Sequence, residues 1–147
     1  MKYTTQVEIN RPVAEVIKLF DDPDNLAKWQ DGLQSFEHLS GTPGKTGAKS
    51  RLVYQIGRRT IEMIETIESR NLPDEFSGTY EAKNVFNRVV NRFTPIEENK
   101  TLYVAEQEFK FSGFMKIMAW LTPGAFRKES QKSLEAFKKF AETEVDK

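Results

Sequence analysis

The sequence predicts an α+β fold in which a curved antiparallel sheet wraps around one long C-terminal helix. Consecutive stretches between residues 33 and 111 read as strands joined by short turns, and strands connected in this way pair antiparallel. Residues 127–144 read as a helix with one apolar stripe and charges elsewhere. This helix is the only predicted element large enough to cover the apolar face of the sheet.

The N-terminal elements precede this sheet. Residues 2–9 alternate between the two faces of a strand, with a period of two. Pro12 opens a helix over residues 12–22, because a proline in the first turn of a helix loses no hydrogen bond there. Asp22 is placed to cap a second, shorter helix that starts at Pro23. We therefore expect two short helices directly after the first strand.

The later elements complete the order. The predicted strands span residues 33–39, 48–56, 59–69, 76–83, 84–94 and 102–111. The turn-rich residues 40–47 separate the first two of them. A helical section over residues 114–121 follows the last strand. Pro123 and Gly124 interrupt it before the long helix resumes near Ala125.

The composition bounds the class of protein. A chain of 147 residues is expected to form one domain, residues 1–147, with 38% hydrophobic and 30% charged residues. Lys plus Arg and Asp plus Glu both number 22, a balance that favours no nucleic-acid partner. Without cysteine there is no thiolate chemistry and no disulfide. The N-terminus lacks a signal-peptide pattern, so we expect a cytoplasmic protein.

The N-terminal region also resembles a known family. The residues that carry the resemblance are the strand ending at Ile9, then Pro12, Val16, Phe20, Asp22-Pro23, Leu26 and Trp29. This pattern, with the order of elements over the whole chain, resembles the START/Bet v 1-like superfamily, also called the polyketide cyclase/dehydrase and lipid transport (SRPBCC) proteins. The resemblance implies a helix-grip fold whose cavity, between sheet and long helix, holds lipids, sterols, polyketides or plant hormones. Some members catalyse cyclisation or dehydration, and one branch activates a chaperone ATPase.

Alternation along the strands predicts which side chains face the inside. Glu65 falls on the inner face with apolar residues, as do Tyr80, Asn87, Asn91 and Gln107. Convergent polar groups among aromatic ones are typical of a small-molecule cavity. The alternative is that they bond to one another, to backbone or to trapped water, or that a bulge turns some of them outward. The predicted ligand-binding residues are Tyr54, Met63, Glu65, Phe76, Tyr80, Asn87, Val89, Asn91, Tyr103, Gln107, Phe109, Phe114, Met118 and Leu121.

The least polar stretch, residues 111–126, carries a single charge, Lys116. A membrane-spanning helix needs about 20 apolar residues, so we expect no transmembrane segment. We expect side chains of this section to lie at the cavity mouth, namely Phe114, Met115, Ile117, Met118 and Leu121. Methionine adapts to varied shapes, which favours a gate over the cavity, with the filling of an irregular core as the alternative.

Other candidate motifs are discarded. Gly44-Lys45-Thr46 matches the end of a phosphate-binding loop, but Leu39 stands where that loop needs a glycine, and a strand follows instead of a helix. A flexible hairpin turn near the cavity mouth is the better interpretation. His38, the only histidine, is interpreted as structural. No spacing of histidines and carboxylates predicts a metal site, and no cofactor is expected.

These patterns lead to three functional hypotheses. The first is binding of a small hydrophobic or amphipathic ligand, of lipid, polyketide or sterol type, in an internal cavity. The second is a cyclase- or dehydratase-type enzyme with Glu65 as acid or base and Tyr80 or Tyr54 as hydrogen-bond donor. No other catalytic residue is predicted. The third is a chaperone-activator-like interaction module that uses Trp120 and Phe126 as an exposed patch. The oligomeric state stays open.

Overall fold

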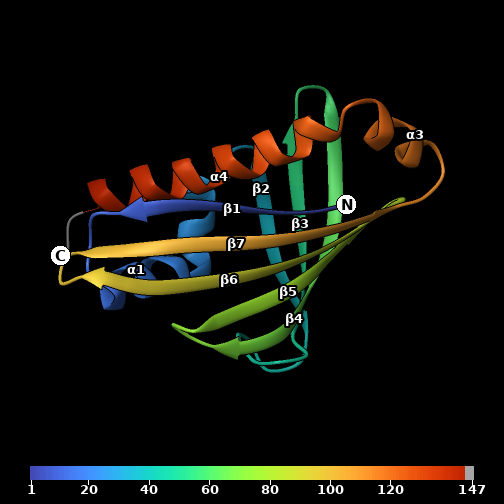
Figure 1. The fold of residues 1–147 in the computed structure, drawn as a ribbon. Helices are drawn as coiled ribbons and strands as arrows, with labels where there is room; N and C mark the ends of the chain where they lie inside the picture. The colour runs from blue at the N-terminus through green and yellow to red at the C-terminus, as the bar shows by residue number, and fades with distance from the viewer. Residues whose placement is uncertain (145–147) are drawn as a thin grey trace.

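The computed structural model describes residues 1–144, and within them seven strands form one antiparallel sheet in the order β1-β7-β6-β5-β4-β3-β2 (Figure 1). The strands are β1 (Lys2–Ile9), β2 (Leu33–Ser40), β3 (Lys49–Ile56), β4 (Arg59–Asn71), β5 (Glu75–Ala82), β6 (Val85–Glu97) and β7 (Lys100–Phe111). The helices are α1 (Val13–Phe20), the 3₁₀ turn η1 (Pro23–Asn25), α2 (Leu26–Trp29), α3 (Phe114–Leu121) and α4 (Pro123–Thr143).

The first strand of the chain pairs with the last strand of the chain. β1 pairs antiparallel with β7, with Val7 opposite Tyr103, while β2 to β7 follow one another as hairpins. The short helices carry the chain from β1 at one edge to β2 at the other. Figure 1 shows the curved sheet with α4 running along β1. The predicted α+β architecture, with two short helices after the first strand, is confirmed.

The short helices begin where the sequence predicts. α1 starts one residue after Pro12, and Pro23 is the first residue of η1. The Asp22 carboxylate accepts a hydrogen bond from the backbone N–H of Asp24 at 2.9 Å, and so satisfies one of the donors left free at a helix start. Trp29, at the end of α2, is buried. The Trp29 ring packs against those of Phe20 and Phe137 in the core.

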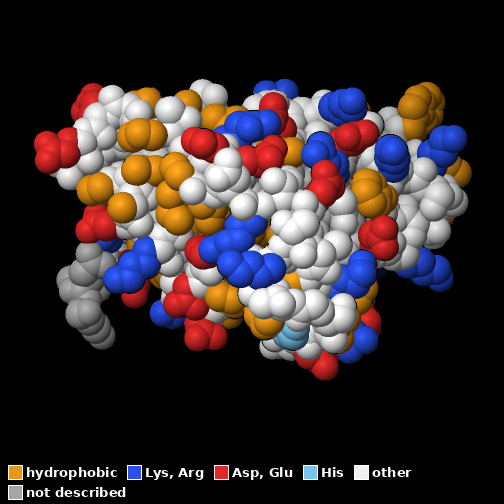
Figure 2. Space-filling view, turned by 90° about the horizontal axis from the view of Figure 1, so that it is seen from below, with side chains coloured by type: hydrophobic (Ala, Val, Ile, Leu, Met, Phe, Trp, Pro, Cys, Tyr) orange, Lys and Arg blue, Asp and Glu red, His pale blue; other side chains and the backbone are white. Residues whose placement is uncertain are grey.

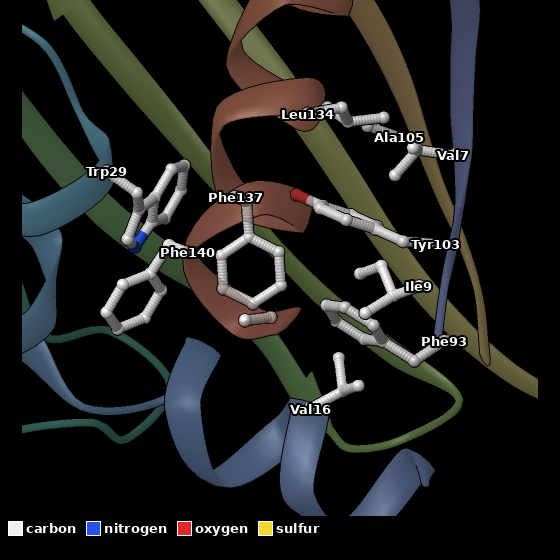
Figure 3. Packing of buried hydrophobic residues seen from close by; sticks show 11 residues of the cluster. Val7, Ile9, Val16, Trp29, Phe93, Tyr103, Ala105, Leu134, Phe137 and Phe140 are labelled. Carbon is white, nitrogen blue, oxygen red and sulfur yellow. The ribbon is translucent and has the colours of Figure 1, made fainter. Parts of the chain in front are cut away.

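The main hydrophobic core lies under the C-terminal half of α4 (Figure 3). Phe137 is fully buried at its centre. Its ring centroid lies 5.0 Å from that of Trp29, 5.6 Å from that of Phe20 and 5.7 Å from that of Tyr103, in edge-to-face arrangements. Such arrangements stabilise aromatic pairs beyond their burial alone. This cluster clamps α4 to the sheet and to the two short helices.

The side of α4 that faces the sheet changes character along its length. Leu134, Phe137 and Ala141 are buried in the core, whereas one and two turns earlier the same side presents Ser133 and Ser130. A serine fills much less space than a leucine or phenylalanine at the same position. The dense core therefore ends at Leu134, and an open space begins beneath the first half of α4.

β4 contains one irregularity that changes the face of a charged residue. Its register with β5 shifts between Ile67 and Ser69, which leaves Glu68 as an extra residue. A bulge of this kind shifts the alternation of side chains by one. Arg70, which would otherwise point outward, therefore lies on the inner face. Glu68 stays on the outer face, where the Arg88 guanidinium donates to it at 2.8 Å.

The outer face of the sheet carries ion pairs between neighbouring strands. Arg92 Nε donates to Glu106 Oε2 at 3.1 Å across the β6–β7 ladder. Arg88 pairs with Glu68 on the β4 side rather than with Glu108, its direct neighbour in β7. Exposed pairs of this kind contribute about 0.2–1 kcal/mol each. They show that the alternation assigns the two faces correctly.

Candidate functional site

A cavity of about 440 Å³ lies between the inner face of the sheet and the first half of α4. Pockets for small molecules typically measure about 300–1,000 Å³, so this one can hold a ligand of modest size. Side chains from α1, η1, α2, α4 and every strand except β1 line it. The cavity thus occupies the space that the resemblance to the START/Bet v 1-like superfamily implied.

Most of the residues predicted from the sequence come together in this lining. Those that line the cavity are Tyr54, Met63, Glu65, Phe76, Tyr80, Asn87, Val89, Asn91, Tyr103, Gln107 and Phe109. His38 also belongs to the lining, together with Pro43 and Gly44 of the predicted hairpin turn. Alternation with a period of two predicts the strand residues of this lining, because each side chain of a strand points to one face or the other according to its position.

The predicted gate is wrong. Phe114, Met118 and Leu121 of α3 do not belong to the lining, and all three are exposed. Figure 1 shows α3 at one end of the molecule, between the end of β7 and the start of α4. Gly113, at a φ of +57°, stands between the end of β7 and the start of α3. The apolar stripe of α3 faces outward.

The predicted exposed patch also needs a correction at Phe126. Its ring lies 5.4 Å from that of Phe109 and 5.0 Å from that of Phe111, and it belongs to the cavity wall. Trp120, in contrast, is 81% exposed. The two aromatic residues therefore belong to different surfaces, one facing the cavity and one facing solvent.

Small side chains create the cavity from both sides. Ser130 and Ser133 face it from α4, and Gly78, Ala82 and Ala105 occupy inner positions of the sheet. At Gly78 a Cβ would come within 3.1 Å of a backbone oxygen in β4, so the close approach of the two strands favours glycine there. Larger side chains at these positions would fill the cavity, and the core would extend through it.

A row of polar side chains crosses the cavity wall. Glu65 in β4 lies directly between Ser50 in β3 and Tyr80 in β5, and Tyr80 in turn lies opposite Asn87 in β6. Directly opposite residues on one face of a sheet are close enough to interact. His38 in β2, opposite Ser50, extends the row toward the sheet edge. Five neighbouring strands thus contribute polar groups to one line.

Burial sets the electrostatics at the middle of this row. It raises the pKa of the Glu65 carboxyl, while a hydrogen-bonding interaction with Tyr80 acts in the opposite direction. Burial, followed by the negative charge of Glu65, raises the pKa of the Tyr80 hydroxyl well above its ordinary value. The Tyr54 pKa is raised by the same two causes in the same order. These hydroxyls stay protonated, and Glu65 keeps its proton to a higher pH than an exposed glutamate.

Other polar groups of the wall are occupied by structural hydrogen bonds. The Asn87 side-chain amide donates to Gln107 Oε1 at 3.0 Å. The Asn91 amide donates to the backbone carbonyl of Phe76 at 3.2 Å and accepts from the Tyr103 hydroxyl at 2.6 Å. For these residues the structural alternative explains the polar inner positions. Glu65 and Tyr80 are the groups best placed to interact with a ligand.

Arg70 and Gln30 are among the lining residues that the sequence did not predict. Arg70 at the rim forms a bidentate ion pair with Asp21, which follows α1. The bulge in β4 brings Arg70 inward, and no local pattern in the sequence signals it. Gln30, directly after α2, accepts a hydrogen bond from the Tyr54 hydroxyl, so that hydroxyl is already engaged. Both contacts join the short helices to the sheet at the cavity mouth.

Within residues 1–144 no group of histidines and carboxylates is arranged to hold a metal ion. One ring nitrogen of His38, Nε2, lies 2.8 Å from the Gly41 carbonyl in an exposed setting at the sheet edge. The same part of the chain holds no helix with the length and apolar character needed to cross a membrane.

The geometry agrees with a family match over nearly the whole chain. Residues 1–142 match the family described as "Polyketide cyclase / dehydrase and lipid transport". The chain belongs to this family. A search among curated proteins found no match.

Solved structures show the same fold at low sequence identity. The Zhui aromatase/cyclase from Streptomyces sp. R1128 superposes with a TM-score of 0.81 at 13% identity, covering 97% of this chain and 93% of that one. A conserved protein from Geobacillus kaustophilus gives 0.79 at 20% identity, with 96% and 95% covered. Norcoclaurine synthase from Thalictrum flavum, in complex with dopamine and hydroxybenzaldehyde, gives 0.70 at 14% identity, with 100% and 89% covered. At these identities the likeness shows the fold alone.

Proposed function

We propose that the protein binds a small hydrophobic or amphipathic molecule in the cavity between the sheet and α4. The observation that carries this proposal is an open volume of about 440 Å³ with aromatic walls and one row of polar groups. Lined predominantly by apolar side chains, with a few placed polar groups, it has the character of a ligand pocket. The apolar part of the ligand packs against Phe76, Phe109 and Phe126, and its polar group meets Glu65 and Tyr80.

The charges of the lining favour an uncharged or cationic ligand over a carboxylate. Arg70 is the only lysine or arginine in the lining, and Asp21 already binds its guanidinium. Glu65 and Glu129 add negative charge when ionised. A ligand carboxylate would have to lose its hydration without gaining a free cation. Neutral molecules with hydroxyl or carbonyl groups are the chemical class that fits best.

The proposal is tested by filling the cavity from α4. Ser133 faces the cavity one turn before Phe137, so Ser133→Phe adds a ring to the open space. The matched control is Lys132→Phe, which places the same ring on the exposed side of the same helix. Binding of the neutral dye Nile red is measured by fluorescence, and native mass spectrometry of protein from its host identifies co-purifying molecules.

We expect Ser133→Phe to weaken dye binding about tenfold or more, and Lys132→Phe to leave it unchanged. Circular dichroism confirms that both variants fold. Equal dye affinity in the folded Ser133→Phe variant would refute binding in this cavity. A crystal structure with a solid core in place of the cavity would refute it independently.

A second function, catalysis of the cyclase or dehydratase type, is supported by the contact between Glu65 and Tyr80. A carboxyl whose pKa is raised by burial suits proton transfer, and a protonated tyrosine hydroxyl suits donation to a developing oxyanion. Glu65→Gln keeps the shape of the side chain and removes its titratable proton. Once a substrate is found, unchanged turnover in this variant would rule out Glu65 as the acid or base.

A further inference from the structure

α3 turns an apolar face toward solvent. Its exposed side chains include Trp120 at 81%, Phe114 at 67%, Leu121 at 61% and Ile117 at 55%. Large exposed apolar residues are common singly, but a contiguous group marks an interaction site. The group belongs to one helix of eight residues at the end of the molecule beyond β7 (Figure 1).

The helix is amphipathic with its apolar side outward. Residues 114, 117, 118 and 121 recur at the spacing of one helical face, and Trp120 adjoins this face. The opposite side packs inward through Ala119, which is buried, and Met115, which is half-buried. Apart from the Trp120 indole, the outward face carries no hydrogen-bonding side chain that could specify a protein partner. This face suits an apolar environment that forms no directional hydrogen bonds with it.

The charges around α3 have one sign. Residues 109–128 include Lys110, Lys116, Arg127 and Lys128 and contain no acidic residue, although lysines and arginines equal the acidic residues in the whole chain, 22 to 22. Figure 2 shows basic side chains beside hydrophobic ones at the end of the molecule that holds α3. An exposed apolar face flanked by cations complements a surface that is both apolar and negatively charged.

The nearest acidic residues do not cancel this charge. Glu108 precedes the segment and lies next to Arg88 on the outer face, while Glu129 follows it and belongs to the cavity lining. Glu81, near Lys110, is balanced by Lys83 in the same hairpin. Counted with the flanking Glu108 and Glu129, the segment carries four basic and two acidic residues, so basic side chains remain in excess around α3.

We propose that α3 docks the protein on an anionic lipid surface. The outward face of the helix enters the interface between headgroups and acyl chains, with Trp120 at headgroup depth. The flanking lysines and arginine bind lipid phosphates. α3 is too short to span the bilayer, so the contact is peripheral and reversible. This surface lies outside the cavity, and the proposal holds whichever ligand the cavity takes.

Docking through α3 would place one end of the cavity near the membrane. The ring of Phe111, just before α3, lies 5.0 Å from that of Phe126 in a tilted arrangement. Phe126 follows α3 and lines the cavity together with Phe109. The helix is thus joined on both sides to the aromatic cavity wall. A lipid-derived ligand would have a short path between the bilayer and the site.

The test uses the two tryptophans as an internal contrast, because Trp29 is buried and Trp120 is exposed. Vesicles of phosphatidylcholine alone and of phosphatidylcholine with phosphatidylglycerol are titrated into the purified chain. We expect co-sedimentation and a blue shift of tryptophan emission with the anionic vesicles only. Ile117→Ser combined with Leu121→Ser should weaken this binding about tenfold or more.

Two further variants separate the causes. Ile56→Ser with Ile96→Ser makes the same chemical change at exposed positions elsewhere and should leave vesicle binding intact. Lys116→Gln and Lys128→Gln should each weaken binding to anionic vesicles about fivefold. No binding to anionic vesicles, or equal binding to neutral ones, overturns the proposal. So does a dimer in the ultracentrifuge that the α3 double variant abolishes without any vesicle binding, which assigns the face to a second copy.

Discussion

The substitution Glu65→Gln tests the electrostatics of the cavity wall through stability. The carboxyl lies on the inner face between Ser50 and Tyr80, where burial raises its pKa above the ordinary value of 4.5. Between the ordinary and the raised value, the folded chain holds a proton that the unfolded chain has released. The free energy of unfolding therefore falls as pH rises, by up to about 1.4 kcal/mol for each pH unit in this window.

Glutamine cannot ionise, so in Glu65→Gln the unfolding free energy no longer falls with rising pH because of this side chain. Below the ordinary pKa both proteins carry a neutral side chain, and their difference in unfolding free energy is constant. As the pH rises through the window, the variant becomes progressively more stable relative to the wild type. Above the raised pKa the difference levels off. Carboxylates elsewhere contribute equally to both proteins and cancel in the difference.

Urea denaturation of both proteins across pH 4–8 measures this difference, with the slope of free energy against urea used to confirm equal exposure on unfolding. The protein is first stripped of bound ligand, because a ligand stabilises the folded state. The control is Glu62→Gln, the same change on the outer face of β4, where Glu62 pairs with Arg51 at 2.9 Å. A pH-independent difference for Glu65→Gln, or one that falls with rising pH, would refute the reasoning.

Two further predictions concern the core and the ligand. Phe137→Ala removes the ring that contacts Trp29 and Tyr103, and should lower the unfolding free energy by about 3–5 kcal/mol in urea melts, with the exposed Lys139→Ala as control. An effect below that of the control would contradict the assigned core. A long-chain alcohol should bind about tenfold more tightly than the fatty acid of equal length at about pH 8, because Asp21 occupies the only arginine of the lining. Equal affinities in calorimetry would contradict the charge argument.

The strands and their faces could be predicted because the signal is local. In β6, alternation alone assigns Asn87, Val89 and Asn91 to the inner face, and all three line the cavity. Arg88 and Arg92, between them, lie outside in ion pairs. A strand has only two faces, so one run of residues decides the assignment. The starts of the short helices are equally local, as the hydrogen bond of Asp22 shows.

The errors arise where the answer depends on distant parts of the chain. The apolar spacing of α3 is the same whether the helix packs on a pocket or faces solvent, because periodicity shows that a face exists and not what covers it. Phe114 and Leu121 were assigned to the cavity mouth for this reason. Arg70 was missed because a bulge depends on how two strands pair, and alternation within one strand does not record it.

The polar residues on the inner face differ in their hydrogen-bond partners, because the register between strands decides which residue lies opposite each of them. Asn91 lies opposite Phe76 in β5, and the Phe76 carbonyl and the Tyr103 hydroxyl satisfy its amide. Glu65 lies opposite Tyr80, and burial leaves both with raised pKa values. The sequence places all of these side chains on one face, but it does not state which residue of the next strand lies opposite. Asn91 is therefore held by a backbone carbonyl and by Tyr103, whereas Glu65 interacts with the hydroxyl of Tyr80, which also lines the cavity, and Glu65 is the position at which chemistry should be tested first.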